Sequence, residues 1–133
     1  MAKSPLTKGA HHIGLTVPDI KQTRTFFLET LGFEEVGEVA DYPAVFLSDG
    51  TTMITLWQAE NPATAISFDR KNVIGLHHFA LMVDSPDALD DLHAKLQTLE
   101  NVEIEFPPEP LGDIATHMMC AIPGGIRTEF IAA

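Results

Sequence analysis

The stretch that decides the fold occurs twice, as Ala10-His-His-Ile-Gly-Leu-Thr-Val-Pro-Asp19 and as Leu76-His-His-Phe-Ala-Leu-Met-Val-Asp-Ser85. His12 aligns with His78, and Val17 aligns with Val83 at the same offset. Each copy is rich in β-branched and aliphatic residues and ends in a residue type that starts helices, which predicts a strand followed directly by a helix. Such repetition is the signature of a duplicated supersecondary module.

The two predicted helices have recognisable ends. Asp19 is the expected N-cap of the first, and Gly32 stands where a terminating glycine is expected. Ser85 is the expected N-cap of the second, with Pro86 at its first helical position. The spacing of its leucines predicts the apolar stripe of an amphipathic helix: Leu89, Leu92, Leu96 and Leu99.

Three strand-like runs follow each predicted helix. The first set covers residues 33–40, 44–48 and 52–58, and the second covers residues 102–106, 115–122 and 126–132. Between the sets lies a polar segment with Pro62 and no periodicity, which predicts a connecting loop. We therefore expect one domain over residues 1–133 with the order βαβββ twice: module one at about 9–58, a linker at 59–73 and module two at about 74–132.

The bulk composition is that of an acidic globular protein. Its 133 residues carry a formal net charge of −11, which disfavours nucleic acid and anionic membrane surfaces as partners. The single cysteine, Cys120, excludes an internal disulfide and fits a reducing compartment. The N-terminal stretch lacks the apolar segment of a secretory signal, and no run approaches the roughly 20 apolar residues that span a bilayer. We expect a cytoplasmic protein.

Histidine pairs begin both copies of the duplicated strand. Successive side chains of a strand point to opposite faces, so one member of each pair should face a shared centre while His11 and His77 point away. The alternative is that these are half-exposed strand histidines with no common purpose. Repetition at equivalent positions favours a shared centre, and two imidazoles with a carboxylate form a known ligand set for Fe(II) and related ions. Glu129, in an otherwise apolar run, is the natural carboxylate, although it could also be an edge-strand charge facing water.

Four further residues are candidates for catalysis or substrate binding. His117 shares strand parity with Met119, so an inward Met119 implies an inward imidazole that could act as a general acid or base. Arg127 shares the parity of Glu129 and could bind a substrate anion or simply pair with a carboxylate. Trp57 and Met119 could line a pocket or belong to the core.

The pattern of these residues resembles that of one protein superfamily. His12 with Val17 and Asp19, the later Phe26-Phe27 and Leu31-Gly32-Phe33, and the closing Pro123-Gly-Gly-Ile-Arg-Thr-Glu129 resemble the vicinal oxygen chelate superfamily. It includes glyoxalase I, fosfomycin-resistance enzymes, extradiol dioxygenases, methylmalonyl-CoA epimerase and bleomycin-binding proteins. The resemblance covers about residues 9–131.

What the resemblance implies is an α+β fold of two tandem βαβββ modules that form a cupped, barrel-like mixed β-sheet. It also implies one divalent metal ion per site, Zn, Ni, Mn or Fe, on His12, His78 and Glu129. Single-domain members commonly form homodimers in which His12 comes from one chain and the other two ligands from its partner.

Departures from the family's patterns bear on the activity. Glyoxalase I has a fourth ligand, a glutamate, where this chain has Thr55 or Leu56. Extradiol dioxygenases and fosfomycin thiol transferases have a tyrosine where this chain has Met119. The first hypothesis is a glyoxalase-like lyase or isomerase in which Glu129 and His117 are catalytic and Trp57, Met119 and Arg127 contact a small-molecule substrate. An Fe(II) extradiol-type dioxygenase and a non-catalytic protein that binds a toxin or antibiotic are the alternatives.

Overall fold

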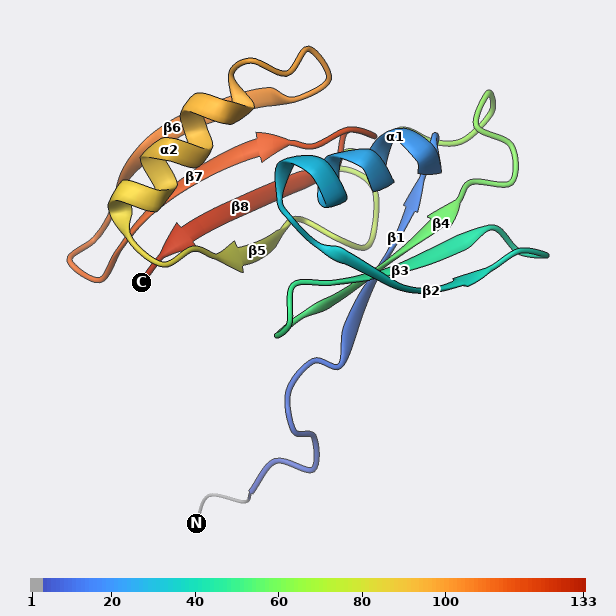
Figure 1. Ribbon diagram of the computed structural model, residues 1–133, viewed down its shortest axis with the longest axis horizontal. Coiled ribbons are helices and arrows are strands. Elements are labelled where there is room, and N and C mark those ends of the chain that lie inside the picture. The colour runs from blue at the N-terminus through green and yellow to red at the C-terminus, as the bar shows by residue number, and fades with distance from the viewer. Residues whose placement is uncertain (1–3) are drawn as a thin grey trace.

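The computed structural model describes residues 4–133 and consists of two four-stranded sheets with two short helical segments (Figure 1). Residues 1–3, part of the N-terminal stretch judged above not to be a signal, lie outside the described residues. The elements in chain order are β1 His12–Val17, α1 Ile20–Thr25, the π-helix η1 Phe26–Thr30, β2 Glu34–Val39, β3 Ala44–Ser48, β4 Met53–Gln58, β5 Phe79–Met82, α2 Pro86–Leu96, β6 Glu103–Leu111, β7 Ala115–Ala121 and β8 Arg127–Ala132.

The two sheets have the same topology. Their strand orders are β1-β4-β3-β2 and β5-β8-β7-β6, so the first strand of each half pairs with its last. That pairing is parallel in both sheets, and the other pairings are antiparallel. The expected α+β fold of duplicated βαβββ units is confirmed; the mixed sheets are cupped and do not close into a barrel.

Side-chain caps start both helices as the sequence predicts. The Asp19 carboxylate accepts a hydrogen bond from the backbone N–H of Gln22, and the Ser85 hydroxyl accepts one from the backbone N–H of Ala88. The first helix widens into η1, where the N–H of Leu31 reaches the carbonyl of Phe26, before Gly32 ends it with a φ of 77°.

One hydrophobic core serves both halves of the chain. Helix α2 lies over β6, β7 and β8 (Figure 1) and packs its buried Leu89 and Leu96 into this core. Two hydrogen bonds also join the halves: Lys95 donates to the carbonyl of Thr30, and Thr23 donates to the carbonyl of Pro123. The helix-bearing faces of the two sheets therefore share the core, and each sheet keeps a second face, called here its open face.

One strand is longer than the sequence predicts. Strand β6 continues past the expected end at Phe106 to Leu111, through Pro107, Pro108 and Pro110. Proline removes a ladder donor and is tolerated on edge strands and at bulges. Because β6 is an edge strand with irregular pairing to β7, the prolines do not end it.

The segment between the sheets, residues 59–78, contains no helix or strand. It crosses from the end of β4 to the start of β5 and is exposed over most of its length. Among residues 4–133, no helix is long and apolar enough to cross a membrane.

Candidate functional site

Strand alternation decides which side chains reach the two open faces. On β8 the core takes Thr128 and Phe130, which leaves Arg127 and Glu129 on the open face. Strand β7 places Met119 directly opposite Glu129, with His117 two residues earlier on the same face. The open face of the second sheet thus carries His117, Met119, Arg127 and Glu129, in agreement with the parity argued from the sequence.

Glu129 is the centre of this face. It is only 8% exposed, and each of its carboxylate oxygens meets a different imidazole. Oε1 lies 3.4 Å from Nε2 of His78, and Oε2 lies 2.5 Å from Nδ1 of His117. A buried carboxylate is unfavourable unless it is paired and hydrogen-bonded, so these two contacts explain how a buried position of β8 accommodates it.

His117 is held on two sides. Its Nδ1 contacts Glu129, and its ring lies edge-on to Phe106 of β6 with 5.0 Å between ring centroids. Its side chain is 12% exposed, so the imidazole lies in the site rather than in bulk solvent. A histidine fixed through one nitrogen keeps its second nitrogen for proton transfer.

The histidine pairs adopt a geometry that strand alternation alone does not predict. Nδ1 of His11 lies 2.9 Å from Nδ1 of His12, and Nδ1 of His77 lies 2.8 Å from Nδ1 of His78. His11 and His77 both precede their strands, where side chains need not alternate between two faces. These contacts do not test whether His11 and His77 point away from the shared centre, which stays a prediction.

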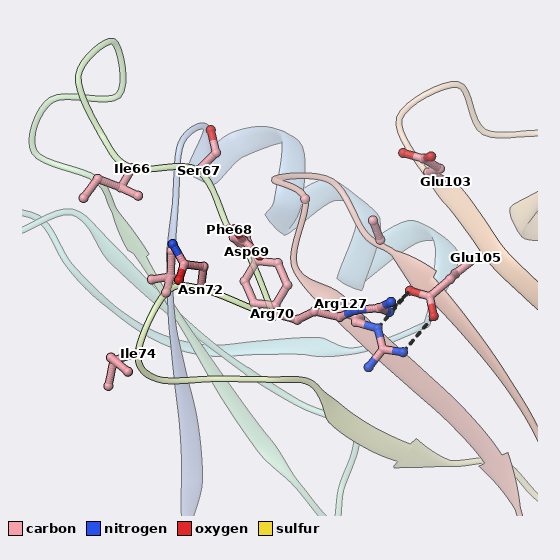
Figure 2. Close-up of a pocket in the computed structure, with 13 residues that line it drawn as sticks. Ile66, Ser67, Phe68, Asp69, Arg70, Asn72, Ile74, Glu103, Glu105 and Arg127 are labelled. Atoms are coloured by element: carbon pink, nitrogen blue, oxygen red, sulfur yellow. Dashed lines mark hydrogen bonds and ion pairs between the residues drawn. The ribbon is translucent and has the colours of Figure 1, made fainter.

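Arg127 anchors a network of charges beside the second pair. Its Nε and Nη2 donate to the two carboxylate oxygens of Glu105 at 2.8 and 2.7 Å, and Arg70 donates to the same carboxylate at 2.8 Å (Figure 2). These hydrogen bonds, led by the one from Arg127, hold the pKa of Glu105 at about 2. Nη1 of Arg127 lies 3.3 Å from Nδ1 of His77, whose pKa is lowered by desolvation and by the charge of Arg127.

An open groove of about 1070 Å³ borders this network (Figure 2). The linker forms one wall with Ile66, Phe68 and Ile74, and the start of β8 forms the other with Arg127. The groove therefore combines apolar side chains with guanidinium groups and with the carboxylates of Asp69, Glu103 and Glu105, and the contact of Arg127 with His77 links it to the histidine and glutamate cluster.

The first sheet carries the other half of the predicted site. His12 pairs with Met53 at the start of β1, and Trp57 lies opposite Thr16 on the same open face. The Trp57 ring packs edge-on against Tyr42 at 5.0 Å, and its indole N–H donates to the hydroxyl of Thr55 at 2.9 Å. Of the two residues that the resemblance offers for the fourth ligand of glyoxalase I, Thr55 lies on the open face and Leu56 is buried in the core.

The structure brings some of the predicted residues together and not others. His78, His117 and Glu129 form a cluster on the second sheet, with Met119 and Arg127 beside it, whereas His12 and Trp57 lie on the first sheet. Over residues 4–133 of one chain, no three His, Cys, Asp or Glu side chains are arranged to hold a metal ion. Cys120 points into the core, where burial raises its pKa to about 12.

Two residues of the charge network, Glu105 and Arg70, could not be identified from the sequence. Glu105 lies on an edge strand interrupted by prolines, so its position relative to Arg127 depends on the register of β6 against β7. Arg70 lies in a loop with no periodicity. Only the excess of acidic over basic residues hints that an arginine on the site's own strand would find a carboxylate.

Comparison with known proteins agrees with this architecture. Residues 9–130 match the family model described as Glyoxalase/Bleomycin resistance protein/Dioxygenase superfamily. The chain is 29% identical over 96 residues to the Bacillus subtilis (strain 168) protein YwkD, which covers 68% of this chain and 73% of that protein.

Two crystal structures share the fold. A glyoxylase/bleomycin resistance protein/dioxygenase domain from Frankia sp. EAN1pec aligns with a TM-score of 0.83 and 22% identity, over 96% of this chain and 93% of that one. A lactoylglutathione lyase from Agrobacterium tumefaciens aligns with a TM-score of 0.71 and 19% identity, over 97% and 96%. With the family match over nearly its whole length, the chain belongs to the glyoxalase/bleomycin resistance protein/dioxygenase superfamily.

Proposed function

We propose that this protein is a divalent-metal-dependent enzyme that acts on a small carbonyl compound as a glyoxalase-like lyase or isomerase. The observation that carries the proposal is the buried carboxylate of Glu129 on β8, held between His78 and His117. A purely structural strand has no need of a carboxylate and two imidazoles at this position, because burying them costs free energy that an apolar residue would not.

The donor set suits a divalent ion. Nε2 of His78 and Oε1 of Glu129 face each other at 3.4 Å, which is the kind of separation that two ligands of one ion have. With His12 they would form the set of two imidazoles and one carboxylate that leaves positions open for substrate. A bound ion there would supply Lewis-acid polarisation of a substrate oxygen. Zn, Ni, Mn and Fe all fit such donors.

We propose that a second copy of the chain completes the site. His12 and Trp57 lie on the open face of the first sheet, and the glutamate cluster lies on the open face of the second. A two-fold dimer that sets the first face of one copy against the second face of the other would build two equivalent sites. The exposure of Tyr42 and Met82, at 59% and 76%, supports such pairing because both are large apolar side chains on these faces.

In this proposal, residues of the chain itself carry out the proton transfer. His117 is fixed through Nδ1 by Glu129 and through its ring by Phe106, which leaves Nε2 to accept or return a substrate proton. Glu129 orients that imidazole as the third member of a catalytic triad orients its base. Met119, opposite Glu129 and nearly buried, contributes an apolar wall that excludes water from the proton transfer.

The groove beside Arg127 is the proposed place for the rest of the substrate. Its apolar wall on Ile66, Phe68 and Ile74 suits a small organic molecule, and Arg127, which is paired with Glu105, adds positive charge to the lining. The mixed lining supports a substrate with both apolar and oxygen-bearing parts. We propose a cytoplasmic location, which the single cysteine supports because it excludes an internal disulfide.

Metal analysis followed by a substrate screen tests this function. Protein purified without added metal or chelator should contain about one divalent ion per chain, and the Glu129→Gln variant should contain far less. Turnover should then appear in a screen of hemithioacetals and 2-oxo acids, with catechols included to detect dioxygenase activity. Protein that neither contains nor binds a divalent ion would overturn the proposal.

One observation supports a second candidate, a protein that captures a small molecule without changing it. Trp57 packs against Tyr42 and Phe46 on the open face of the first sheet, with ring centroids 5.0 and 6.2 Å away. Exposed aromatic rings bind flat apolar ligands with little loss of side-chain entropy. Tight binding of a planar antibiotic by metal-free protein, without turnover, would favour this candidate.

A further inference from the structure

Each proposed ligand histidine, His12 and His78, contacts the imidazole of the preceding histidine through its Nδ1. The contact joins Nδ1 to Nδ1 in both cases, at 2.9 Å between His11 and His12 and at 2.8 Å between His77 and His78. The rings meet edge to face, with centroids 5.2 and 5.0 Å apart. The same arrangement therefore occurs at equivalent positions of both modules.

In the second pair the position of the hydrogen follows from Arg127. A guanidinium group has five N–H donors and no acceptor, so the 3.3 Å contact from Nη1 makes Nδ1 of His77 an acceptor. Nδ1 of His77 then carries no hydrogen. The 2.8 Å contact between the two imidazoles is then a hydrogen bond donated by Nδ1–H of His78, and the single lone pair of His77 Nδ1 is shared between this short donor and the longer contact from Arg127.

Arg127 is itself held in place. Glu105 accepts from both Nε and Nη2, a paired geometry that fixes the plane of the guanidinium group. A chain of contacts thus runs from Glu105 through Arg127 and His77 to His78. His78, the last residue of this chain of contacts, belongs to the proposed metal site, because its Nε2 faces Oε1 of Glu129.

The position of this hydrogen determines what Nε2 of His78 can bind. A neutral imidazole with its hydrogen on Nδ1 presents a lone pair at Nε2. That lone pair and the oxygen of Glu129, 3.4 Å away, are both acceptors, and neither can donate to the other. A cation between them satisfies both groups, either a metal ion or a proton on Nε2, and the tautomer measurement below distinguishes these two.

We propose that His77 and Arg127 are positioning residues that hold His78 with its hydrogen on Nδ1 and its Nε2 free for a metal ion. This inference rests on the proposed function only in that His78 serves as a ligand; the tautomer is a property of the metal-free chain. Hydrogen bonds of this kind to ligating imidazoles commonly contribute about 10–100-fold to metal affinity.

Nitrogen-15 NMR of the imidazole side chains in chelator-treated protein tests the tautomer directly. In the wild type His78 should carry its hydrogen on Nδ1. Removing the acceptor with His77→Ala should produce a mixture that includes the Nε2–H form. His77→Asn should restore the wild-type tautomer, because its amide oxygen can take the place of Nδ1 as the acceptor. A wild-type His78 with its hydrogen on Nε2 overturns the inference.

Zn²⁺ affinity, measured by competition with a chromophoric chelator, provides the second readout. His77→Ala should bind Zn²⁺ about 10–100-fold more weakly than wild type, and His77→Asn should recover most of the loss. His93→Ala, on helix α2, is the matched control and should leave the affinity unchanged. Equal Zn²⁺ affinity of His77→Ala and wild type overturns the inference. A wild type with the Nδ1–H tautomer but no Zn²⁺ binding contradicts the proposed function alone.

Discussion

At the scale of single residues, Glu129 is a carboxylate at a buried strand position. Burial removes its hydration at a cost in free energy, and its contacts with two imidazoles offset part of that cost. Cys120 is the opposite case, a reactive residue type made inert by burial in the core. Reactivity here follows from which face of a strand a residue occupies.

The role proposed for His117 predicts a specific separation of effects. His117→Ala should lower turnover by about 10²–10⁴-fold, because it removes a general acid or base and not a metal ligand. The bound metal should remain, as measured by metal analysis of the purified variant. A variant that turns over at the wild-type rate would make His117 a bystander, and His93→Ala serves as the surface control.

Glu105 predicts a pH dependence of stability. Its pKa is about 2 in the folded chain and ordinarily 4.5, so folding favours the ionised form. The stabilisation is complete above about pH 4.5 and is lost as the pH falls toward 2. Because the side chain is 36% exposed, solvent screening reduces the contribution to about 1 kcal/mol. Urea unfolding of wild type and Glu105→Gln should show a stability difference that shrinks over this range; a difference independent of pH would contradict the assignment.

At the scale of elements, helix α2 depends on its cap. The Ser85 hydroxyl accepts the N–H of Ala88 at 3.0 Å, and Pro86 occupies the first turn. Ser85→Ala should lower the free energy of unfolding by about 1 kcal/mol, because it leaves one helix N–H without a partner. Ser85→Asp should keep most of the stability, since a carboxylate can accept the same hydrogen bond. Chemical denaturation measures both; equal losses in the two variants would argue against capping.

The same caps explain which parts of the fold the sequence predicts. Asp19 and Ser85 act locally, on backbone groups three residues away, and both are found where expected. The extension of β6 through Pro110 depends on its edge position, which the local sequence does not report. The local sequence likewise does not report the wider turn of η1, in which Phe26 and Phe27 are buried.

For the site, strand parity correctly brought His117, Met119 and Arg127 to the face of Glu129. Parity does not apply to His11 and His77, because both residues lie before a strand, and their contacts with His12 and His78 have no signal in the sequence pattern. The contact between Arg127 and Glu105 spans two strands that are not neighbours in their sheet, and no pattern in the sequence reports such a distance. The location of His12 relative to Glu129 depends on assembly and stays a prediction.

At the scale of the whole molecule, the proposed dimer predicts complementation between two defective variants. His12→Ala and Glu129→Gln should each lose metal binding. When they are unfolded, mixed in equal amounts and refolded, half of the dimers are mixed, and each mixed dimer has one site with both wild-type residues. The mixture should therefore bind about a quarter of the wild-type metal. No recovery on mixing, or a mass of 14.5 kDa by light scattering, would contradict the shared site.

The hydrophobic core shared by the two halves should keep them together after the linker between them is cleaved. Because each half closes its own sheet by pairing its first strand with its last, the linker is not needed to complete either sheet. Lys71 is exposed within that linker, so trypsin should nick the native protein there. The two fragments should then elute together under native conditions and separate only in denaturant, since the apolar contacts between them outlast the severed peptide bond. Gel filtration of the digest measures this, and fragments that fall apart without denaturant would show that the tether holds the halves together.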